Sequence, residues 1–332
     1  MIRDRTQPRE KLLVLLGPTA SGKTALSIRL AQALGTEIIS GDSMLVYRGF
    51  NIGTAKPTSE EMAGIRHHMI DILPPYAGFN LMDFLLQVKK LITRLNQQGK
   101  IPILAGGTGL YIQSLLEGYE LNRQSEAPEY RRHLERLAEE RGREYVHDML
   151  ARVNPEAAAR LHVNDFRRII RALEVYHIGG EEISQKKSRQ LVYDSYVAGL
   201  TWQRCKLYDR INQRVDLMMS QGLQQEIRQL LAAGVPADSQ AMKGIGYKEL
   251  LPVLAMEEAA QAVSSVSGPA QLSLQQAVAD IQKNSRHFAK RQLTWYRRMP
   301  YIHWYQPELY PDMEKLADNV LWDVRRWLDS RD

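Results

Sequence analysis

Cysteine is almost absent from this 332-residue sequence, in which only Cys205 occurs. A single cysteine excludes an internal disulfide and any metal site built from several cysteines, and it fits a reducing, cytoplasmic location. No apolar run approaches the roughly 20 residues that span a bilayer, so we expect no membrane segment. The first stretch, MIRDRTQPRE, is polar and lacks the apolar core of a signal peptide. The eight histidines show no spacing typical of metal ligands.

The charge of the chain also lacks a strong bias. Its net charge of +6 permits a nucleic-acid partner without requiring one. Hydrophobic residues at 44% and charged residues at 25% are ordinary for a globular protein. The length predicts one large α/β domain and a smaller second domain.

Short apolar runs that end at turn residues predict buried strands, and segments with helical periodicity lie between them. This alternation predicts a parallel, doubly wound α/β sheet flanked by helices. Ligands bind such sheets at the carboxyl ends of the strands, where we expect residues 17–24, Asp42 and residues 106–108. The predicted strands are 11–17, 37–42, 100–107 and 197–202, and the predicted helical segments include 24–35, 79–99 and 207–234.

The middle of the chain has a different character. Residues 120–196 are rich in arginine and glutamate, show helical periodicity and contain no convincing strand. We interpret them as a mostly helical insertion domain within a discontinuous core of residues 1–119 and 197–332. Further along, the small, polar stretch SSVSGPAQLS at 264–273 predicts a surface loop.

The stretch GPTASGKT matches the phosphate-binding pattern G-x-x-x-x-G-K-[ST] through Gly17, Gly22, Lys23 and Thr24. Such a loop turns backbone N–H groups toward an anion at the positive end of the following helix. In this pattern Lys23 contacts the terminal phosphate and the Thr24 hydroxyl ligates Mg²⁺. The pattern predicts a P-loop, because a strand precedes it and a helix follows, but it does not name the ligand.

An aspartate that P-loop kinases place at the end of a later strand is missing here. The strand predicted at 100–107 ends in glycines and Thr108 instead. Its absence favours a diphosphate that is not part of a nucleotide. Asp42 follows another predicted strand, and two interpretations stay open for it: a general base or indirect Mg²⁺ ligand, or a turn residue.

Residues 281–298 form the strongest basic segment, with six lysines or arginines and no acid. Cations with interleaved aromatic residues are typical of nucleic-acid binding, although Trp295 could equally belong to the core. Two weaker basic stretches are RRIIR at 167–171, which fits a solvated helix face, and KGIGYK at 243–248, which fits a plain turn.

Seven motifs together resemble the tRNA dimethylallyltransferases, in the same order along nearly the whole chain. They are GPTASGKT, ISGDSMLVYRGFNIGTAKPT, HHMIDI, LAGGTGLYIQSLLEG, RRIIRALEVY, KGIGYKEL and AKRQLTWYRR. The resemblance implies transfer of a dimethylallyl group from its diphosphate to N6 of the adenosine 3′-adjacent to the tRNA anticodon. It also implies Mg²⁺ dependence, a P-loop NTPase-like core and a helical insertion that grips the anticodon stem-loop.

The resemblance also implies roles for particular residues. It places the prenyl diphosphate along Thr19, Ala20, Ser21, Gly22, Lys23 and Thr24, with Gly17 opening the loop. It places Asp42, Thr108 and Arg214 at the reacting centre. It implies tRNA contacts by Asp42, Ser43, Met44, Leu45, Arg131, Arg167, Arg168, Arg171, Lys243, Lys248, Lys290, Arg291 and Arg297.

Three other functions remain as alternatives: a P-loop kinase for a small metabolite or nucleotide, a prenyltransferase for free adenine nucleotides, and a tRNA-binding protein without catalysis. The missing strand-end aspartate counts against the first. The basic segments favour a larger RNA over a free nucleotide, and intact Lys23, Thr24 and Asp42 favour catalysis. We expect the chain to act as a monomer.

Overall fold

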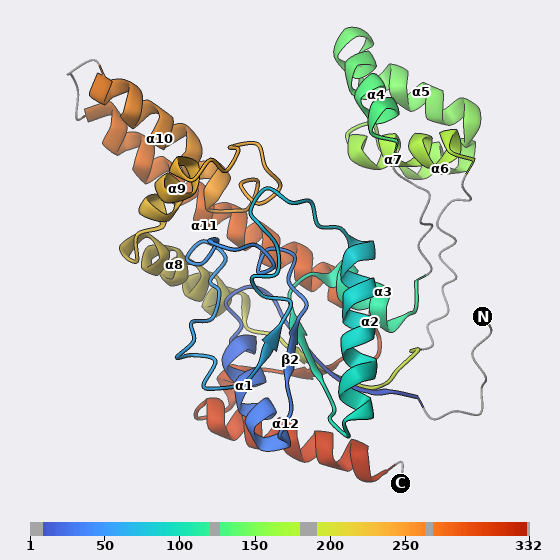
Figure 1. The fold of residues 1–332 in the computed structure, drawn as a ribbon, viewed down its shortest axis with the longest axis vertical. Coiled ribbons are helices and arrows are strands. Elements are labelled where there is room, and N and C mark those ends of the chain that lie inside the picture. The colour runs from blue at the N-terminus through green and yellow to red at the C-terminus, as the bar shows by residue number, and fades with distance from the viewer. Residues whose placement is uncertain (1–8, 120–126, 180–190, 263–267, 331–332) are drawn as a thin grey trace. The chain divides into compact units, whose positions relative to one another are not determined.

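The computed structural model describes residues 9–119, 127–179, 191–262 and 268–330 (Figure 1). The chain divides into a core unit, Met1–Leu116 with Gln190–Asp332, and a helical unit, Glu117–Arg189. The boundary that we expected after residue 196 falls inside strand β5 (Asp194–Leu200). Residues 194–196 therefore belong to the sheet, and the strand was placed too late because its first two residues are polar.

The core unit contains a six-stranded, all-parallel sheet, which confirms the predicted fold class. The strand order is β3-β2-β4-β1-β5-β6, so the first strand lies inside the sheet between two later ones. Two edge strands were not predicted, because runs of two or three residues are too short to show a period. The strands are β1 Lys11–Leu16, β2 Ile38–Ser40, β3 His67–His68, β4 Ile103–Gly106, β5 and β6 His303–Tyr305.

Helices cover both faces of the sheet, as expected for a doubly wound fold. Helices α1 (Lys23–Leu34) and α12 (Met313–Asp329) pack together on one side, and α2 (Leu81–Gln97) lies on the other (Figure 1). Alternate residues of β1, Leu13 and Leu15, belong to the same cluster as the buried residues of α1 and α12. Each buried leucine contributes about 1.5–3 kcal/mol, so this strand anchors the sheet.

The remaining helices of the core unit follow strands β4, β5 and β6 along the chain. Gly222 has a φ of 95° and divides the helical segment expected at 207–234 into two helices. Helix α11 begins at Gly268, so residues 268–273 of the expected loop are helical; Pro269 is tolerated in a first turn, and Ala, Gln and Leu favour helix. The rest of that loop, residues 264–267, lies outside the described residues. Besides α1, α2 and α12, the described part of the core unit contains α3 Gly109–Leu116, α8 Arg204–Ser220, α9 Leu223–Ala232, α10 Tyr247–Ala262, α11 Gly268–Tyr296 and the short 3₁₀ helix Pro307–Leu309.

The two ends of the core unit that flank the helical unit lie next to each other. The Val192 N–H donates to the Leu116 carbonyl at 2.9 Å. The chain therefore leaves the core unit and re-enters it at one point on its surface.

The helical unit is described over residues 127–179, and there it contains four helices around its own apolar core. Leu134, Val146, Leu150, Ile169 and Leu173 form the centre of that core. The helices are α4 Pro128–Arg141, α5 Arg143–Val153, α6 Pro155–Arg160 and α7 Phe166–His177. Across the described parts of both units, no helix is long and apolar enough to cross a membrane.

Candidate active site

One pocket of about 410 Å³ opens where β1, β2 and β4 end. The loops after these strands meet there, and helices α8 and α11 supply the opposite walls. All of its lining residues belong to the core unit. The structure brings together in it these residues predicted for the site: Thr19, Lys23, Thr24, Asp42, Ser43, Met44, Leu45, Thr108, Arg214, Lys243, Lys248 and Arg291.

The P-loop between β1 and α1 has an unusual backbone that other elements hold in place. Ala20 has a φ of 61°, a left-handed conformation that costs a residue with a side chain about 1–2 kcal/mol. The Trp202 indole donates to the Ser21 carbonyl at 3.0 Å, and Arg210 Nε donates to the Ala20 carbonyl at 2.9 Å. These two hydrogen bonds hold the loop backbone in this conformation. The predicted residues Gly17, Ala20, Ser21 and Gly22 shape this loop without lining the pocket.

Lys23, the first residue of α1, is half-buried beside the pocket's other charges. Burial and the nearby Arg214 guanidinium lower the pKa of Lys23 from 10.5 to about 8, while Asp42 opposes the shift. Burial also lowers the pKa of Arg214 below its ordinary value, again opposed by Asp42. Two crowded cations with one carboxylate make a site that a multiply charged anion stabilises.

The side chain of Asp42 is held by the turn that it begins. Its Oδ1 accepts the Met44 N–H at 2.8 Å, and its own N–H donates to Ser40 Oγ at 3.3 Å. Asp42 therefore closes a turn, as one interpretation predicted, and it also lines the pocket. A Cβ built on Gly107 would lie 3.9 Å from Asp42 Oδ2 and 3.8 Å from Lys23 Nζ, so carboxylate and ammonium face the same small volume.

Strand β4 ends in glycines where P-loop kinases have an aspartate, and these glycines let the loops after β2 and β4 touch. A Cβ on Gly106 would lie 2.5 Å from the Gly41 carbonyl carbon, so only glycine fits there. Two residues further along the same loop, the Thr108 hydroxyl accepts the Ser43 N–H at 3.2 Å. The Thr108 N–H donates to the Gly41 carbonyl at 3.3 Å. This loop therefore supports the turn that carries Asp42.

One wall of the pocket is apolar, and sequence reasoning missed it. Ile211, Val215 and Met218 of α8 line the pocket together with Ile281 and Phe288 of α11. The α8 residues share a helix face with Arg214, at spacings of three and four residues, and that face was the available signal. The wall can hold an apolar group next to the cationic P-loop.

A buried carboxylate shapes another part of the wall. Glu226 of α9 accepts the N–H groups of Asn51, Ile52 and Gly53 at 2.9, 2.7 and 3.2 Å, and the Tyr247 hydroxyl at 2.7 Å. Only 7% of its surface is exposed. Gly53 and Tyr247 both line the pocket, so Glu226 fixes this loop without lining the pocket itself.

The basic segment of α11 has an exposed face and a buried face. Lys290, Arg291 and Arg297 are exposed, whereas Gln292 and Tyr296 are buried. Trp295 packs closely on Gly109, where a Cβ would lie 2.6 Å from Trp295 Cδ1. Trp295 is therefore half-buried against this glycine, and the exposed side chains of the segment include Phe288 as well as the cations.

Comparison with known proteins identifies the family. The IPP transferase family model matches residues 45–299. The chain is 47% identical over 313 residues to the tRNA dimethylallyltransferase of Bacillus cytotoxicus, which covers 93% of each chain. The chain belongs to the tRNA dimethylallyltransferase family. The family predicted from the motifs is confirmed.

Solved structures of related transferases agree with this dimethylallyltransferase assignment. The tRNA isopentenylpyrophosphate transferase of Bacillus halodurans matches with a TM-score of 0.68 and 38% identity, over 97% of this chain and 98% of that one. A eukaryotic dimethylallyltransferase acting on tRNA matches with a TM-score of 0.73 and 28% identity, over 90% of this chain and 74% of that one. The likeness therefore extends over both units.

In this dimethylallyltransferase-family chain, four predicted RNA contacts belong to the helical unit. Arg131 and Arg171 donate to the fully buried Glu174 at 2.8 and 2.9 Å. Burial alone would raise the pKa of Glu174, but the hydrogen bonds from these two arginines hold it below its usual value. Arg131 thus joins α4 to α7 and Arg171 holds Glu174 from within α7, while Arg167 and Arg168 are exposed on α7.

Lys243 and Lys248, two of the RNA contacts predicted in the core unit, flank a turn at the pocket. Gly246 in this turn has a φ of 99°, a conformation that favours glycine. Both lysines are exposed and line the pocket, and Lys248 Nζ lies 3.6 Å from Glu249 Oε1.

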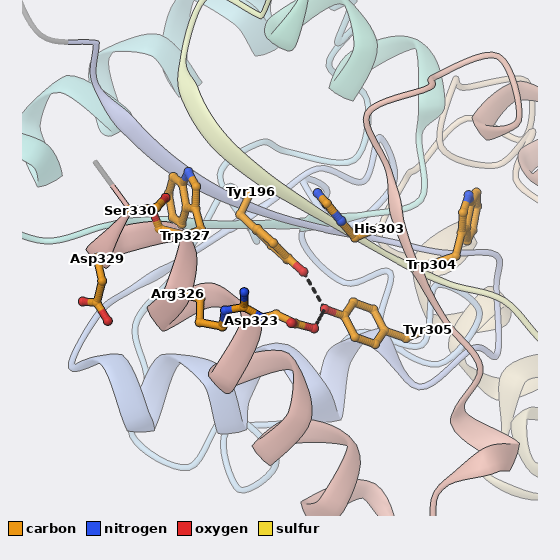
Figure 2. A pocket seen from close by; sticks show the side chains of 9 residues that line it. All are labelled: Tyr196, His303, Trp304, Tyr305, Asp323, Arg326, Trp327, Asp329 and Ser330. Atoms are coloured by element: carbon orange, nitrogen blue, oxygen red, sulfur yellow. Dashed lines mark hydrogen bonds between the residues drawn. The ribbon is translucent and has the colours of Figure 1, made fainter. Parts of the chain in front are cut away.

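A second, more open pocket of about 760 Å³ lies at the sheet edge formed by β6 and contains none of the predicted residues. Figure 2 shows the hydroxyls of Tyr196 and Tyr305 pointing toward each other and toward Asp323. Tyr305 donates to Asp323 at 2.6 Å, and the two tyrosine hydroxyls are 2.6 Å apart. These bonds fasten β5 and β6 to α12, a structural role.

Proposed function

We propose that this chain transfers a dimethylallyl group from dimethylallyl diphosphate to N6 of the adenosine 3′-adjacent to the anticodon in tRNA, with release of diphosphate. One observation carries the proposal: a single pocket combines a cationic half, with Lys23 and Arg214, and an acceptor half, with Asp42 and Thr108. Membership of the tRNA dimethylallyltransferase family supports it.

The diphosphate is the leaving group in this reaction. As the bond from the allylic carbon to oxygen breaks, negative charge grows on the diphosphate, and P-loop N–H groups, Lys23 and Arg214 stabilise it. The Thr19 N–H is already donated to Gln292 at 2.9 Å, so Thr19 contributes its hydroxyl. The allylic carbon can lose diphosphate because its positive charge is delocalised, and the apolar α8 wall offers that carbon no competing nucleophile.

Asp42 serves the acceptor. The exocyclic amine of adenine is a poor nucleophile, because its lone pair is conjugated with the ring. Asp42 Oδ1 is bonded to the Met44 N–H, which leaves Oδ2 to accept N6–H, orient the amine and take its proton. The base reaches this enclosed position by flipping out of the anticodon loop onto the segment from Asp42 to Leu45.

Mg²⁺ is the proposed cofactor, and the donor set fits a metal that protein and substrate share. Thr24 is exposed in the first turn of α1 and lines the pocket. Among the described residues, no group of three or more His, Cys, Asp or Glu could hold a metal ion. Mg²⁺ commonly binds through few protein ligands plus phosphate oxygens and water. The Thr24 hydroxyl would hold it there, where it would neutralise charge on the diphosphate.

Cations in each of the two units are proposed to contact the RNA. In the core unit these are Lys243, Lys248, Lys290, Arg291 and Arg297, and in the helical unit the exposed Arg167 and Arg168 with Arg131 and Arg171. They would contact phosphates of the anticodon stem-loop. We further propose cytoplasmic action as a monomer.

A labelled-donor assay tests the function. The chain is incubated with labelled dimethylallyl diphosphate and Mg²⁺, and with tRNA, AMP or no acceptor. Label in tRNA that digestion assigns to an N6-modified adenosine is the expected result. Label in AMP alone would indicate the free-nucleotide enzyme, and phosphorylation of a metabolite by ATP without prenyl transfer would indicate the kinase.

A further inference from the structure

Gln292 is a buried amide within the basic segment of α11, with only 5% of its surface exposed. Both ends of the amide are used. Its Oε1 accepts the Thr19 N–H at 2.9 Å, and its Nε2 donates to the Gly107 carbonyl at 2.8 Å. One end meets a donor and the other an acceptor, so a neutral amide fits this place and a carboxylate does not.

The two bonds of Gln292 reach the two halves of the pocket. Thr19 lies in the P-loop, which also carries Lys23 and Thr24. Gly107 precedes Thr108, whose hydroxyl accepts the Ser43 N–H next to Asp42. Gln292 therefore connects the element that holds the leaving group with the element that holds the nucleophile.

The Gly107 end of this connection is fixed from a second side. The Tyr296 hydroxyl, four residues along the same helix, also donates to the Gly107 carbonyl at 2.7 Å. A Cβ on Gly107 would lie 2.6 Å from Gln292 Nε2, so the glycine permits the close approach. At the Thr19 end, Gln292 is the partner of the N–H.

We propose that Gln292 is a positioning residue that sets the spacing between the P-loop and the loop of Gly107 and Thr108. The proposal rests on the proposed transfer reaction. Transfer requires the allylic carbon and N6 to approach to about 3–3.5 Å in line, and a displacement of about 1 Å costs roughly 10²-fold in rate. Gln292 lines the pocket, but both ends of its amide are bonded to protein groups, so its proposed role is alignment of the two loops and not binding of a substrate.

This role predicts an effect on turnover that is separate from binding. Gln292→Met keeps the length of the side chain and removes both hydrogen bonds. We expect kcat to fall about 10²-fold, while the KM for dimethylallyl diphosphate and the Kd for tRNA change less than about threefold. The matched control is Gln276→Met at an exposed position of α11, where the amide donates to Asp280 at 3.2 Å, and kcat should not change.

Gln292→Glu provides a readout that a packing role would not move. Its ionised carboxylate still accepts the Thr19 N–H but repels the Gly107 carbonyl. When protonated, the same group accepts from Thr19 and donates to Gly107, which restores both bonds. The ratio of variant to wild-type kcat should therefore rise as pH falls from 8 to 6, while the same ratio for Gln292→Met stays flat.

Each outcome has one meaning. Wild-type kcat in Gln292→Met, or equal tenfold losses in kcat and in both affinities, would overturn the positioning role. If the methionine variant does not fold, Gln292→Glu carries the test, and a ratio independent of pH refutes the role. A wild-type chain that transfers no label to tRNA refutes the proposed function itself, which a Gln292 variant alone cannot do.

Discussion

The lowered pKa of Lys23 makes the affinity for the prenyl donor depend on pH. In the free protein, burial and Arg214 lower this pKa from 10.5 to about 8. A diphosphate adjacent to the ammonium favours the charged form and returns the pKa toward its ordinary value. Below pH 8 Lys23 is already protonated and the affinity is constant. Above pH 8 binding must take up a proton, and the Kd rises about tenfold per pH unit.

The expected change is large enough to measure. When the bound diphosphate restores the Lys23 pKa from about 8 to its ordinary 10.5, the Kd for dimethylallyl diphosphate should rise about 20-fold between pH 7.5 and 9.5. Phosphate groups with a second pKa near 6 are fully ionised over this window, so they do not contribute. Calorimetry without RNA, at fixed Mg²⁺ and in buffers of different ionisation enthalpy, reports both Kd and proton uptake.

Two variants separate Lys23 from the other titrating groups. Lys23→Met has no charge at any pH, and Lys23→Arg keeps its charge throughout, so both should give a flat pH profile. Lys23→Met should bind the donor weakly but retain tRNA affinity, because this lysine faces the diphosphate. A wild-type Kd that is constant from pH 7.5 to 9.5 without proton uptake would refute the electrostatic reasoning.

Three further predictions follow from the described contacts. Asp42→Asn keeps the turn but cannot take a proton, so single-turnover transfer should slow by roughly 10²–10⁴ with little change in tRNA affinity; a near-wild-type rate would leave Asp42 as a turn residue only. Replacing Lys290 and Arg291 by alanine should reduce the salt slope of tRNA binding by about 1.5, and an unchanged slope would place this face away from the RNA. Glu226→Gln puts a donor among four donors and should lower the free energy of unfolding by about 2–4 kcal/mol in urea titrations, unlike an exposed Glu→Gln control.

The parts predicted correctly from sequence depend on local patterns. Lys23 and Thr24 were found because the P-loop fits within eight residues between a strand and a helix. Ile211 and Gln292 were missed because their partners in the P-loop, Ala20 and Thr19, lie about 190 and 270 positions away in the sequence. Glu226 was missed for the same reason, since its partners lie on a loop about 175 positions earlier.

The hydrogen bond between Val192 and Leu116 has a consequence for how this chain can change. This bond holds the two ends of the core chain together, so the inserted segment is connected to the core unit in the way that a surface loop is. Exchange, lengthening or removal of that segment leaves the sheet register and the pocket lining in place, since none of the lining residues comes from it. A short turn that joins residues 116 and 192 should therefore give a shortened chain that keeps every residue of the pocket lining, on which other modules could be grafted.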